Sequence, residues 1–285
     1  MTPLDYLLLF AAAFAGGAVN AVAGGGTLLT FPSLLWAGLP ARVANAVSTA
    51  ALWPGQLSSL WGYRKQLRGA GLAVAVMFLP SMIGGAAGAL LLIKTSNGAF
   101  ERIVPWLILL ATCLFLAQEP ISRAVLRRRA TNAADGSEPS DAPRPSVRWL
   151  MVAVFQVFVA TYGGYFGAGI GIVMLAVLAL MGLQNIHQMN GVKAVNALTI
   201  NAVATCLFIS QGLINWRLAA WMAVGSILGG YLGAGLAQRA GQRAVRRTII
   251  VIGLGLAVAL FVQSAYNGAH GVDRKQHTSK PSGRG

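Results

Sequence analysis

The chain has 285 residues, of which 56% are hydrophobic and only 10% charged, with a formal net charge of +15. A soluble domain carries about 25% charged residues, so this composition excludes an ordinary soluble enzyme or binding domain. The basic residues flank long apolar runs that contain the aromatic residues, a pattern that argues against nucleic-acid binding and is typical of an all-α polytopic membrane protein partnered by the lipid bilayer.

Apolar runs between polar, Gly or Pro breaks predict ten membrane segments, five in each half of the chain. The first five segments are 4–22, 27–38, 43–61, 70–93 and 101–118. The second five are 148–163, 169–182, 190–211, 217–237 and 247–264. The chain therefore divides into a first transmembrane repeat (1–118), a linker (119–147), a second transmembrane repeat (148–264) and a tail (265–285).

The linker and the tail differ in composition from the apolar segments. The linker contains three consecutive arginines followed by TNAADGSEPSDAPRPS, and the tail reads HGVDRKQHTSKPSGRG from residue 270. Segments rich in Pro, Ser and charge bury too little apolar area to become ordered. We therefore predict a flexible linker over 119–147 and a disordered tail over 265–285.

The two halves of the chain resemble each other. SMIGGAAGA at 81–89 matches SILGGYLGA at 226–234. Asn45 and Asn190 are as far apart in the sequence as these two motifs are. Such matches in constant order predict an internal duplication. Because each repeat would have about five segments, an odd number, the two repeats would be inverted relative to each other in the membrane.

The basic residues test this orientation. If the N-terminus lies outside, the loops after the third, fifth and ninth segments are cytoplasmic, and these loops hold most of the Lys and Arg residues between segments. The positive-inside rule then places the linker in the cytoplasm. The basic residues of the tail disagree with this orientation.

Two glycine-rich breaks occur at matching positions in the halves. AGGGTLLTFP at 23–32 opens a segment, 27–38, that would make a helix only about 18 Å long, against a hydrocarbon core of about 30 Å. Residues 169–182 are similarly short. Broken or short helices near 24–38 and 167–182 therefore predict a transporter's substrate site, because unwound backbone at membrane depth must line a cavity or be buried in protein.

The glycines of each break have two interpretations. Gly24, Gly25 and Gly26 can let the backbone open, so that the helix beginning near Thr27 directs free N–H groups and its positive dipole end at an anion. The second break would act from the opposite side through Gly167, Gly169 and Gly171. The alternative is close helix packing, which we expect for Gly84, Gly88, Gly229 and Gly233.

Polar side chains inside the segments extend the candidate site. Those selected are Asn45, Ser48 and Thr49 after the first break, and Asn190, Lys193 and Asn201 after the second. Asn and Thr can instead form interhelical hydrogen bonds. Lys193 can attract an anion or extend toward the membrane surface. No Asp or Glu lies deep in a predicted segment, which argues against a cation antiporter and favours an anionic substrate.

The motifs AVAGGGTLLTFPSLLWAGLPARVANAVST and GAGIGIVMLAVLALMGL, the latter followed by HQMNGVKAVNALTINAVA, resemble the paired signatures of the sulfite exporter TauE/SafE family of membrane transporters. The resemblance covers about residues 5–262. It implies a multi-pass carrier in the bacterial inner membrane, a secondary transporter that exports sulfite or an organosulfonate. An anion channel or a non-transporting membrane component is the alternative. The residues predict no cofactor, no metal and no enzymatic activity, because no His, Cys and acid cluster occurs in a segment.

Overall fold

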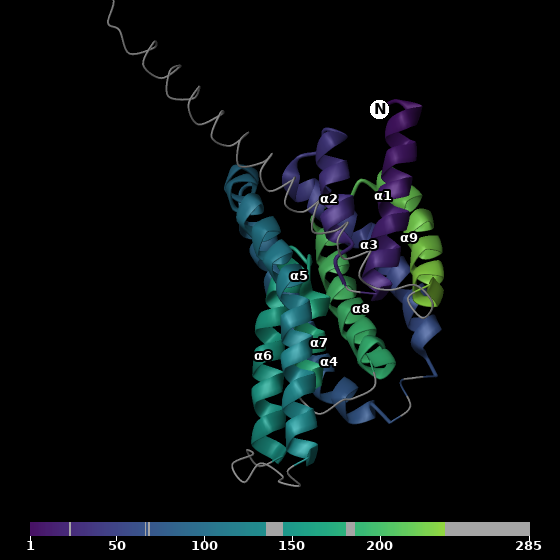
Figure 1. Cartoon of the computed structure of the whole chain (residues 1–285). Coiled ribbons are helices and arrows are strands. Elements are labelled where there is room, and N and C mark those ends of the chain that lie inside the picture. Colours follow the sequence, from purple (N-terminus) through teal and green to yellow (C-terminus); the bar gives the residue numbers. More distant parts are fainter. Residues whose placement is uncertain (23, 66, 68, 135–144, 181–185, 237–285) are drawn as a thin grey trace, which may run out of the picture.

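The computed structural model describes residues 1–22, 24–65, 67, 69–134, 145–180 and 186–236, and within these ranges it contains nine α-helices and no β-strand (Figure 1). The helices of the first half are α1 (Pro3–Val22), α2 (Thr27–Trp36), α3 (Ala41–Tyr63), α4 (Gly71–Lys94) and α5 (Asn97–Ala134). Those of the second half are α6 (Pro145–Tyr165), α7 (Ile170–Leu180), α8 (Ile186–Ser210) and α9 (Trp216–Leu236). The all-α class is confirmed, and each of the first nine predicted segments coincides with one helix. The tenth predicted segment, 247–264, and the tail lie outside the described residues.

Helix α5 corrects the predicted extent of the linker. It continues to Ala134, and α6 begins at Pro145, so the described residues at both ends of 119–147 are helical. The interpretation of the linker as flexible throughout is therefore wrong over 119–134. The physical reason is that AVLRRRATNAA combines strong helix formers such as Ala, Leu and Arg. Low hydropathy limits how far a segment enters a bilayer, but it does not prevent a helix from extending into water.

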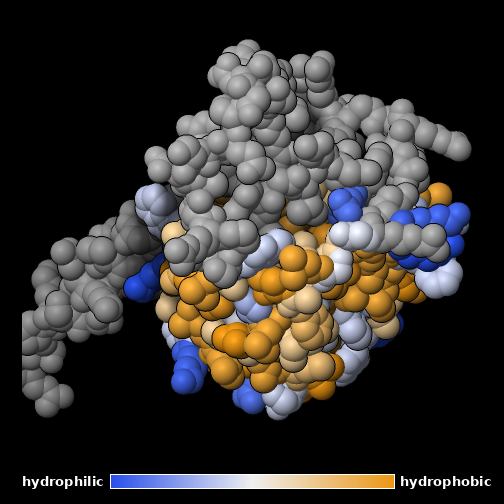
Figure 2. All heavy atoms as spheres, turned by 90° about the horizontal axis from the view of Figure 1, so that it is seen from below, coloured by the Kyte–Doolittle hydropathy of each residue, from blue (hydrophilic) through white to orange (hydrophobic). Residues whose placement is uncertain are grey.

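Four stretches among the described helices are long and apolar enough to cross a membrane: Pro3–Ala21, Gly71–Lys94, Asn97–Leu114 and Gln188–Ser210. The outer surface agrees with this reading, because large apolar side chains such as Leu79 and Phe158 are more than half exposed. Apolar residues dominate the described part of the face seen in Figure 2, and polar residues are scattered mainly toward its edges. Such a surface is suited to contact with lipid chains rather than with water.

The long helices pack in two similar pairs, α1 along α9 and α4 along α6. Small residues allow this close approach. A Cβ added at Gly84 or Gly88 would overlap the backbone of α6, and one at Gly229 or Gly233 would overlap the backbone of α1. The predicted packing role of these four glycines is thus confirmed, as expected for small residues spaced four apart on membrane helices.

Replacing Gly88 by alanine should destabilise the α4–α6 pair. The added Cβ would overlap the carbonyl oxygen of Thr161, so the two helices would have to separate. We expect a lower midpoint of thermal unfolding in detergent for Gly88→Ala. Gly98→Ala is the matched control, since nothing lies within 4 Å of a Cβ there. Equal midpoints for the two variants would contradict the packing role.

An aromatic cluster fixes the short helix α2 inside the protein. Phe31 of α2, Phe100 of α5 and Phe166, just after α6, are almost fully buried. The rings meet edge to face, with 5.4 Å between the centroids of Phe31 and Phe166. Edge-to-face pairs of this kind stabilise a packed core beyond their burial alone. The cluster therefore anchors α2 against the end of α6, next to the second glycine break.

Candidate functional site

The two glycine breaks touch each other in the centre of the molecule. The N–H of Gly169 donates a hydrogen bond to the carbonyl oxygen of Gly24, with 3.2 Å between the atoms. A Cβ added to Gly24 would lie 2.6 Å from the Cα of Gly171. Gly24, Gly167 and Gly169 all have positive φ, between 78° and 83°. This left-handed conformation is strained for residues with a Cβ. The sequence of each break thus permits two unwound backbones to cross in contact.

At the first break, only one of the three consecutive glycines has a left-handed backbone conformation. Among Gly24, Gly25 and Gly26, positive φ occurs at Gly24 alone, and Gly26 has helical dihedrals of −58° and −30°. The Gly26 N–H donates to Asn20 Oδ1 at 2.9 Å, and the N–H of Leu28 donates to the carbonyl oxygen of Gly25 at 3.0 Å. The prediction that the first amides of α2 are free to face an anion is therefore wrong for these groups. Asn20, one turn before the break, folds back and satisfies the helix start.

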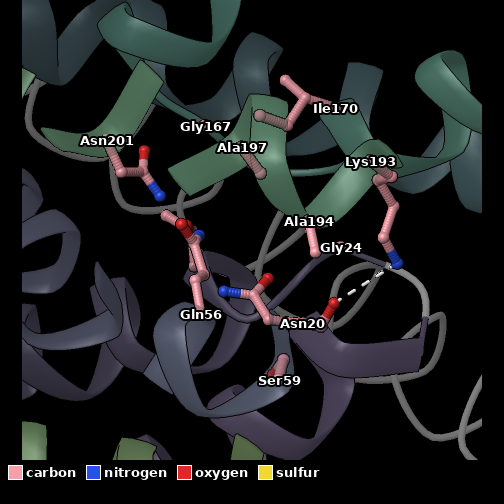
Figure 3. Close-up of a pocket in the computed structure, with 12 residues that line it drawn as sticks. Asn20, Gly24, Gln56, Ser59, Gly167, Ile170, Lys193, Ala194, Ala197 and Asn201 are labelled. Atoms are coloured by element: carbon pink, nitrogen blue, oxygen red, sulfur yellow. Dashed lines mark hydrogen bonds between the residues drawn. The ribbon is translucent and has the colours of Figure 1, made fainter. Parts of the chain in front are cut away.

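A small pocket with both polar and apolar lining residues lies beside the crossing (Figure 3). Its volume is about 20 Å³, enough for about one water molecule. The residues that line it come from the end of α1, the first break with the start of α2, α3, the second break with the start of α7, and α8. The lining residues are Asn20, Gly24, Thr27, Gln56, Ser59, Gly167, Ile170, Gly171, Lys193, Ala194, Ala197 and Asn201.

The pocket brings together about half of the residues that the sequence selects. Those that line it are Gly24, Thr27, Gly167, Gly171, Lys193 and Asn201. Those that lie outside its lining are Gly25, Gly26, Asn45, Ser48, Thr49, Gly169 and Asn190. The second group is not remote, however, because several of its members hold the residues of the first group or the ends of the broken helices in place.

Three of the residues outside the lining form hydrogen bonds within the protein. Asn45 Nδ2 donates to the carbonyl oxygen of Tyr165, the last residue of α6, at 3.0 Å. The hydroxyls of Ser48 and Thr30 are 2.6 Å apart, and the Thr49 hydroxyl donates to the carbonyl oxygen of Asn45. Asn45 and Ser48 thus follow the alternative interpretation, interhelical hydrogen bonding. These hydrogen bonds fix α2 and the end of α6 relative to α3.

Lys193 lies inside the protein, with only 2% of its surface exposed. Its Nζ donates to Asn190 Oδ1 at 2.9 Å and to the carbonyl oxygens of Asn20 and Ala21, both at 3.4 Å. These two carbonyls are near the C-terminal end of α1, where the helix dipole is negative and stabilises a cation. The ammonium group therefore does not extend to the membrane surface. It binds the end of α1 at the edge of the pocket.

Asn20, Gln56 and Ser59 also line the pocket, although the sequence did not select them as site residues. Gln56 Oε1 is buried and has no hydrogen-bond partner, in a side chain that is only 6% exposed. The internal repeat could have indicated Gln56, because Gln56 and Asn201 are separated by the same number of residues as Asn45 and Asn190. Ser59 carried no signal beyond its place one turn after Gln56.

The electrostatics of the pocket favour an anion over a cation. Among the described lining residues, Lys193 carries a formal charge and the other polar side chains are neutral amides or hydroxyls. Amide N–H groups, hydroxyls and an ammonium can all donate hydrogen bonds to an oxyanion. In the described part of the chain, no three His, Cys, Asp or Glu residues are placed to hold a metal ion.

Comparison with known proteins places the chain among membrane transporters. The family model described as "Sulfite exporter TauE/SafE" matches residues 9–260. A probable membrane transporter protein of Haemophilus influenzae is 30% identical over 250 residues, covering 86% of this chain and 90% of the relative. Probable membrane transporter protein YfcA of Escherichia coli K12 is 27% identical over 269 residues, covering 93% and 92%. No solved structure matches the chain. The relatives are named as transporters rather than as enzymes, in agreement with the sequence prediction.

Proposed function

Because the chain belongs to the sulfite exporter TauE/SafE family and is a membrane transporter, we propose that it is a secondary transporter that exports a small sulfur-containing anion, such as sulfite or an organosulfonate, across the bacterial inner membrane. The proposal rests mainly on the contact between the two glycine breaks. Broken helices that meet beside a pocket with polar side chains in its lining are the typical form of a transporter's substrate site. The ammonium and the neutral donors around the pocket suit an anion.

The helix pairing supports an arrangement of two inverted repeats. Helix α1 corresponds in order to α6, and α4 to α9, so the α1–α9 and α4–α6 pairs are equivalent contacts between the halves. The capping of the breaks is also reciprocal: Asn45 of the first half binds the carbonyl at the end of α6, and Lys193 of the second half binds carbonyls at the end of α1. Reciprocal contacts of this kind are expected if each half moves against the other around the pocket.

The pocket is closed in this structure, and we propose that it belongs to a carrier rather than to an anion channel. A conducting channel needs a path that is wide enough for ions to pass, whereas this pocket has room for about one water molecule. A carrier passes through a closed state of this kind between its two open states. A closed channel has a narrow path as well, so the flux kinetics described below distinguish the two. We place the pocket at the centre of that alternating movement.

Flux measurements on the full-length purified protein in proteoliposomes test the proposed function. Vesicles loaded with sulfite, thiosulfate, sulfate or methanesulfonate are diluted into medium that contains only a trace of the same anion in labelled form. A carrier should give saturable uptake that an internal anion accelerates by exchange. Uptake that rises linearly with concentration would indicate the channel instead. The absence of flux for every sulfur anion, relative to empty vesicles, would overturn the proposal.

The orientation of the chain can be tested in intact cells. We expect residue 137, in the linker beyond the described residues, to be cytoplasmic, because most basic loop residues fall on that side. Ser137→Cys, in a chain whose Cys113 and Cys206 are changed to Ser, should react with an impermeant maleimide only after the cells are permeabilised. Efficient labelling of intact cells would contradict the proposed orientation.

A further inference from the structure

We propose that a groove between the starts of α1 and α9 binds an anionic phospholipid, with the lipid phosphate on Arg217 and an acyl chain along the apolar face of α9. The groove is separate from the pocket beside the crossing, because the described residues that line the two sites include none in common. The inference therefore does not depend on the proposed substrate. It follows from the position of the groove, the guanidinium at its head and its apolar lining.

The groove lies where two neighbouring helices begin. Helices α1 and α9 run side by side (Figure 1). They are parallel, because Tyr6 meets Trp221 near the start of both helices and Ala18 lies against Gly233 near the end of both. Since Pro3–Ala21 is long and apolar enough to cross a membrane, the first turns of α1 and α9 lie at one boundary of the hydrocarbon core. Tyr and Trp are enriched at that level. The groove is therefore at the depth of lipid headgroups.

Arg217 supplies the positive charge at the head of the groove. Its guanidinium stacks over the Tyr6 ring, with 5.4 Å between Cζ and the ring centroid. Within the described part of the chain, the guanidinium forms neither a hydrogen bond nor an ion pair, so its N–H donors are available to a ligand. A planar guanidinium can bind a phosphate through two parallel N–H···O bonds. Stacking on Tyr6 orients the plane of the guanidinium for such a contact.

The charges around the groove favour an anionic lipid over a zwitterionic one. Helices α1 and α9 carry one acidic residue between them, Asp5. Its carboxylate accepts a hydrogen bond from the Thr2 N–H at 2.6 Å and does not line the groove. Phosphatidylglycerol would place its single negative charge on Arg217. The ammonium of phosphatidylethanolamine would find no carboxylate among the described lining residues and would be repelled by the guanidinium.

The body of the groove is apolar and held in a fixed shape. Ala220, Trp221 and Val224 follow Arg217 at the spacing of one helical face. Trp221 Nε1 donates to the Tyr6 carbonyl oxygen at 2.8 Å, which holds the indole ring against α1. Val224 is 51% exposed and Trp221 44%. The groove has a volume of about 840 Å³, against about 20 Å³ for the pocket beside the crossing. An acyl chain that continues from a phosphate on Arg217 would cover these exposed side chains.

Native mass spectrometry of the purified full-length protein tests the inference. The protein in a neutral detergent is titrated with dioleoyl phosphatidylglycerol or dioleoyl phosphatidylethanolamine, and the dissociation constant of the first bound lipid is measured. We expect phosphatidylglycerol to bind about fivefold more tightly, the effect of one basic residue near an anionic lipid surface. Arg217→Gln should abolish this preference. Arg102→Gln should retain it and is the matched control, because Arg102 of α5 is also exposed but does not line the groove. Equal binding of the two lipids by the parent, or an unchanged preference in Arg217→Gln, would overturn the proposal.

A second variant distinguishes a lipid from other occupants. Val224→Trp fills the apolar part of the groove and keeps Arg217, and the exposure of Val224 allows the larger side chain without repacking of the core. It should weaken binding of phosphatidylglycerol, because the acyl chain loses its place. Glycerol phosphate, a soluble headgroup without acyl chains, should not displace the lipid. Displacement by glycerol phosphate together with unchanged lipid binding by Val224→Trp would assign the groove to a free phosphate ester. A dimer mass that Arg217→Gln abolishes would assign it to a second copy of the chain. Either result would overturn the proposal.

Discussion

Gly24→Ala is expected to abolish transport. The residue has φ of 78°, a conformation that costs about 1–2 kcal/mol for a residue with a Cβ. The added Cβ would also lie 2.6 Å from the Cα of Gly171, closer than real Cβ contacts. The two breaks would have to separate, and the hydrogen bond from Gly169 N–H to the Gly24 carbonyl would be lost. Anion flux in proteoliposomes measures the effect.

Gly38→Ala separates the two causes. Gly38 has φ of 86°, but nothing lies within 4 Å of a Cβ at this position. The variant therefore carries the same backbone strain without the contact between breaks, and we expect it to retain transport with slightly reduced stability. If Gly24→Ala transports as well as Gly38→Ala, the contact between the breaks is not required for function. If size-exclusion chromatography shows that Gly24→Ala does not fold, the contact between the breaks is needed for the stability of the protein rather than for transport itself.

The fold follows from the sequence to a large extent, because hydrophobic segment length is a local property. The nine described helices begin and end within a few residues of the predicted segments in most cases. The prediction failed at residues 119–134, where α5 continues. In these residues the helix propensity is high, but the hydropathy is too low for a membrane segment. The prediction considered the low hydropathy alone and therefore missed the helix.

The site was less predictable, because its details depend on contacts between distant segments. The paired glycine breaks locate the region, and Gly24, Gly167 and Gly171 line the pocket. Which of three consecutive glycines opens the backbone depends on Asn20, whose amide oxygen binds the Gly26 N–H across the break. No local pattern indicates that bond. Likewise, the carbonyls that bind Lys193 come from the other half of the chain.

Lys193→Gln is expected to weaken anion binding at least tenfold, equivalent to about 1.4 kcal/mol. The substitution removes the formal charge among the described residues of the pocket lining, while an amide of similar reach can still bond Asn190 or the end of α1. Ala21 also keeps the Tyr63 hydroxyl as a donor to its carbonyl, at 3.4 Å. We therefore expect the folded state to survive, with the loss appearing in affinity measured by calorimetry.

Lys193→Arg should retain part of the affinity, since arginine keeps the charge but presents a planar fork of donors in place of a compact ammonium. Arg217→Gln is the control, because Arg217 is exposed and stacks over the Tyr6 ring, with 5.4 Å between its Cζ and the ring centroid. It should bind the anion as the parent does. If Lys193→Gln also binds like the parent, the ammonium serves only to hold the end of α1, and recognition rests on the neutral amides and hydroxyls. If the arginine variant binds no better than the glutamine variant, the geometry of the ammonium matters as much as its charge, because its N–H donors must reach the anion and the α1 carbonyls from one point.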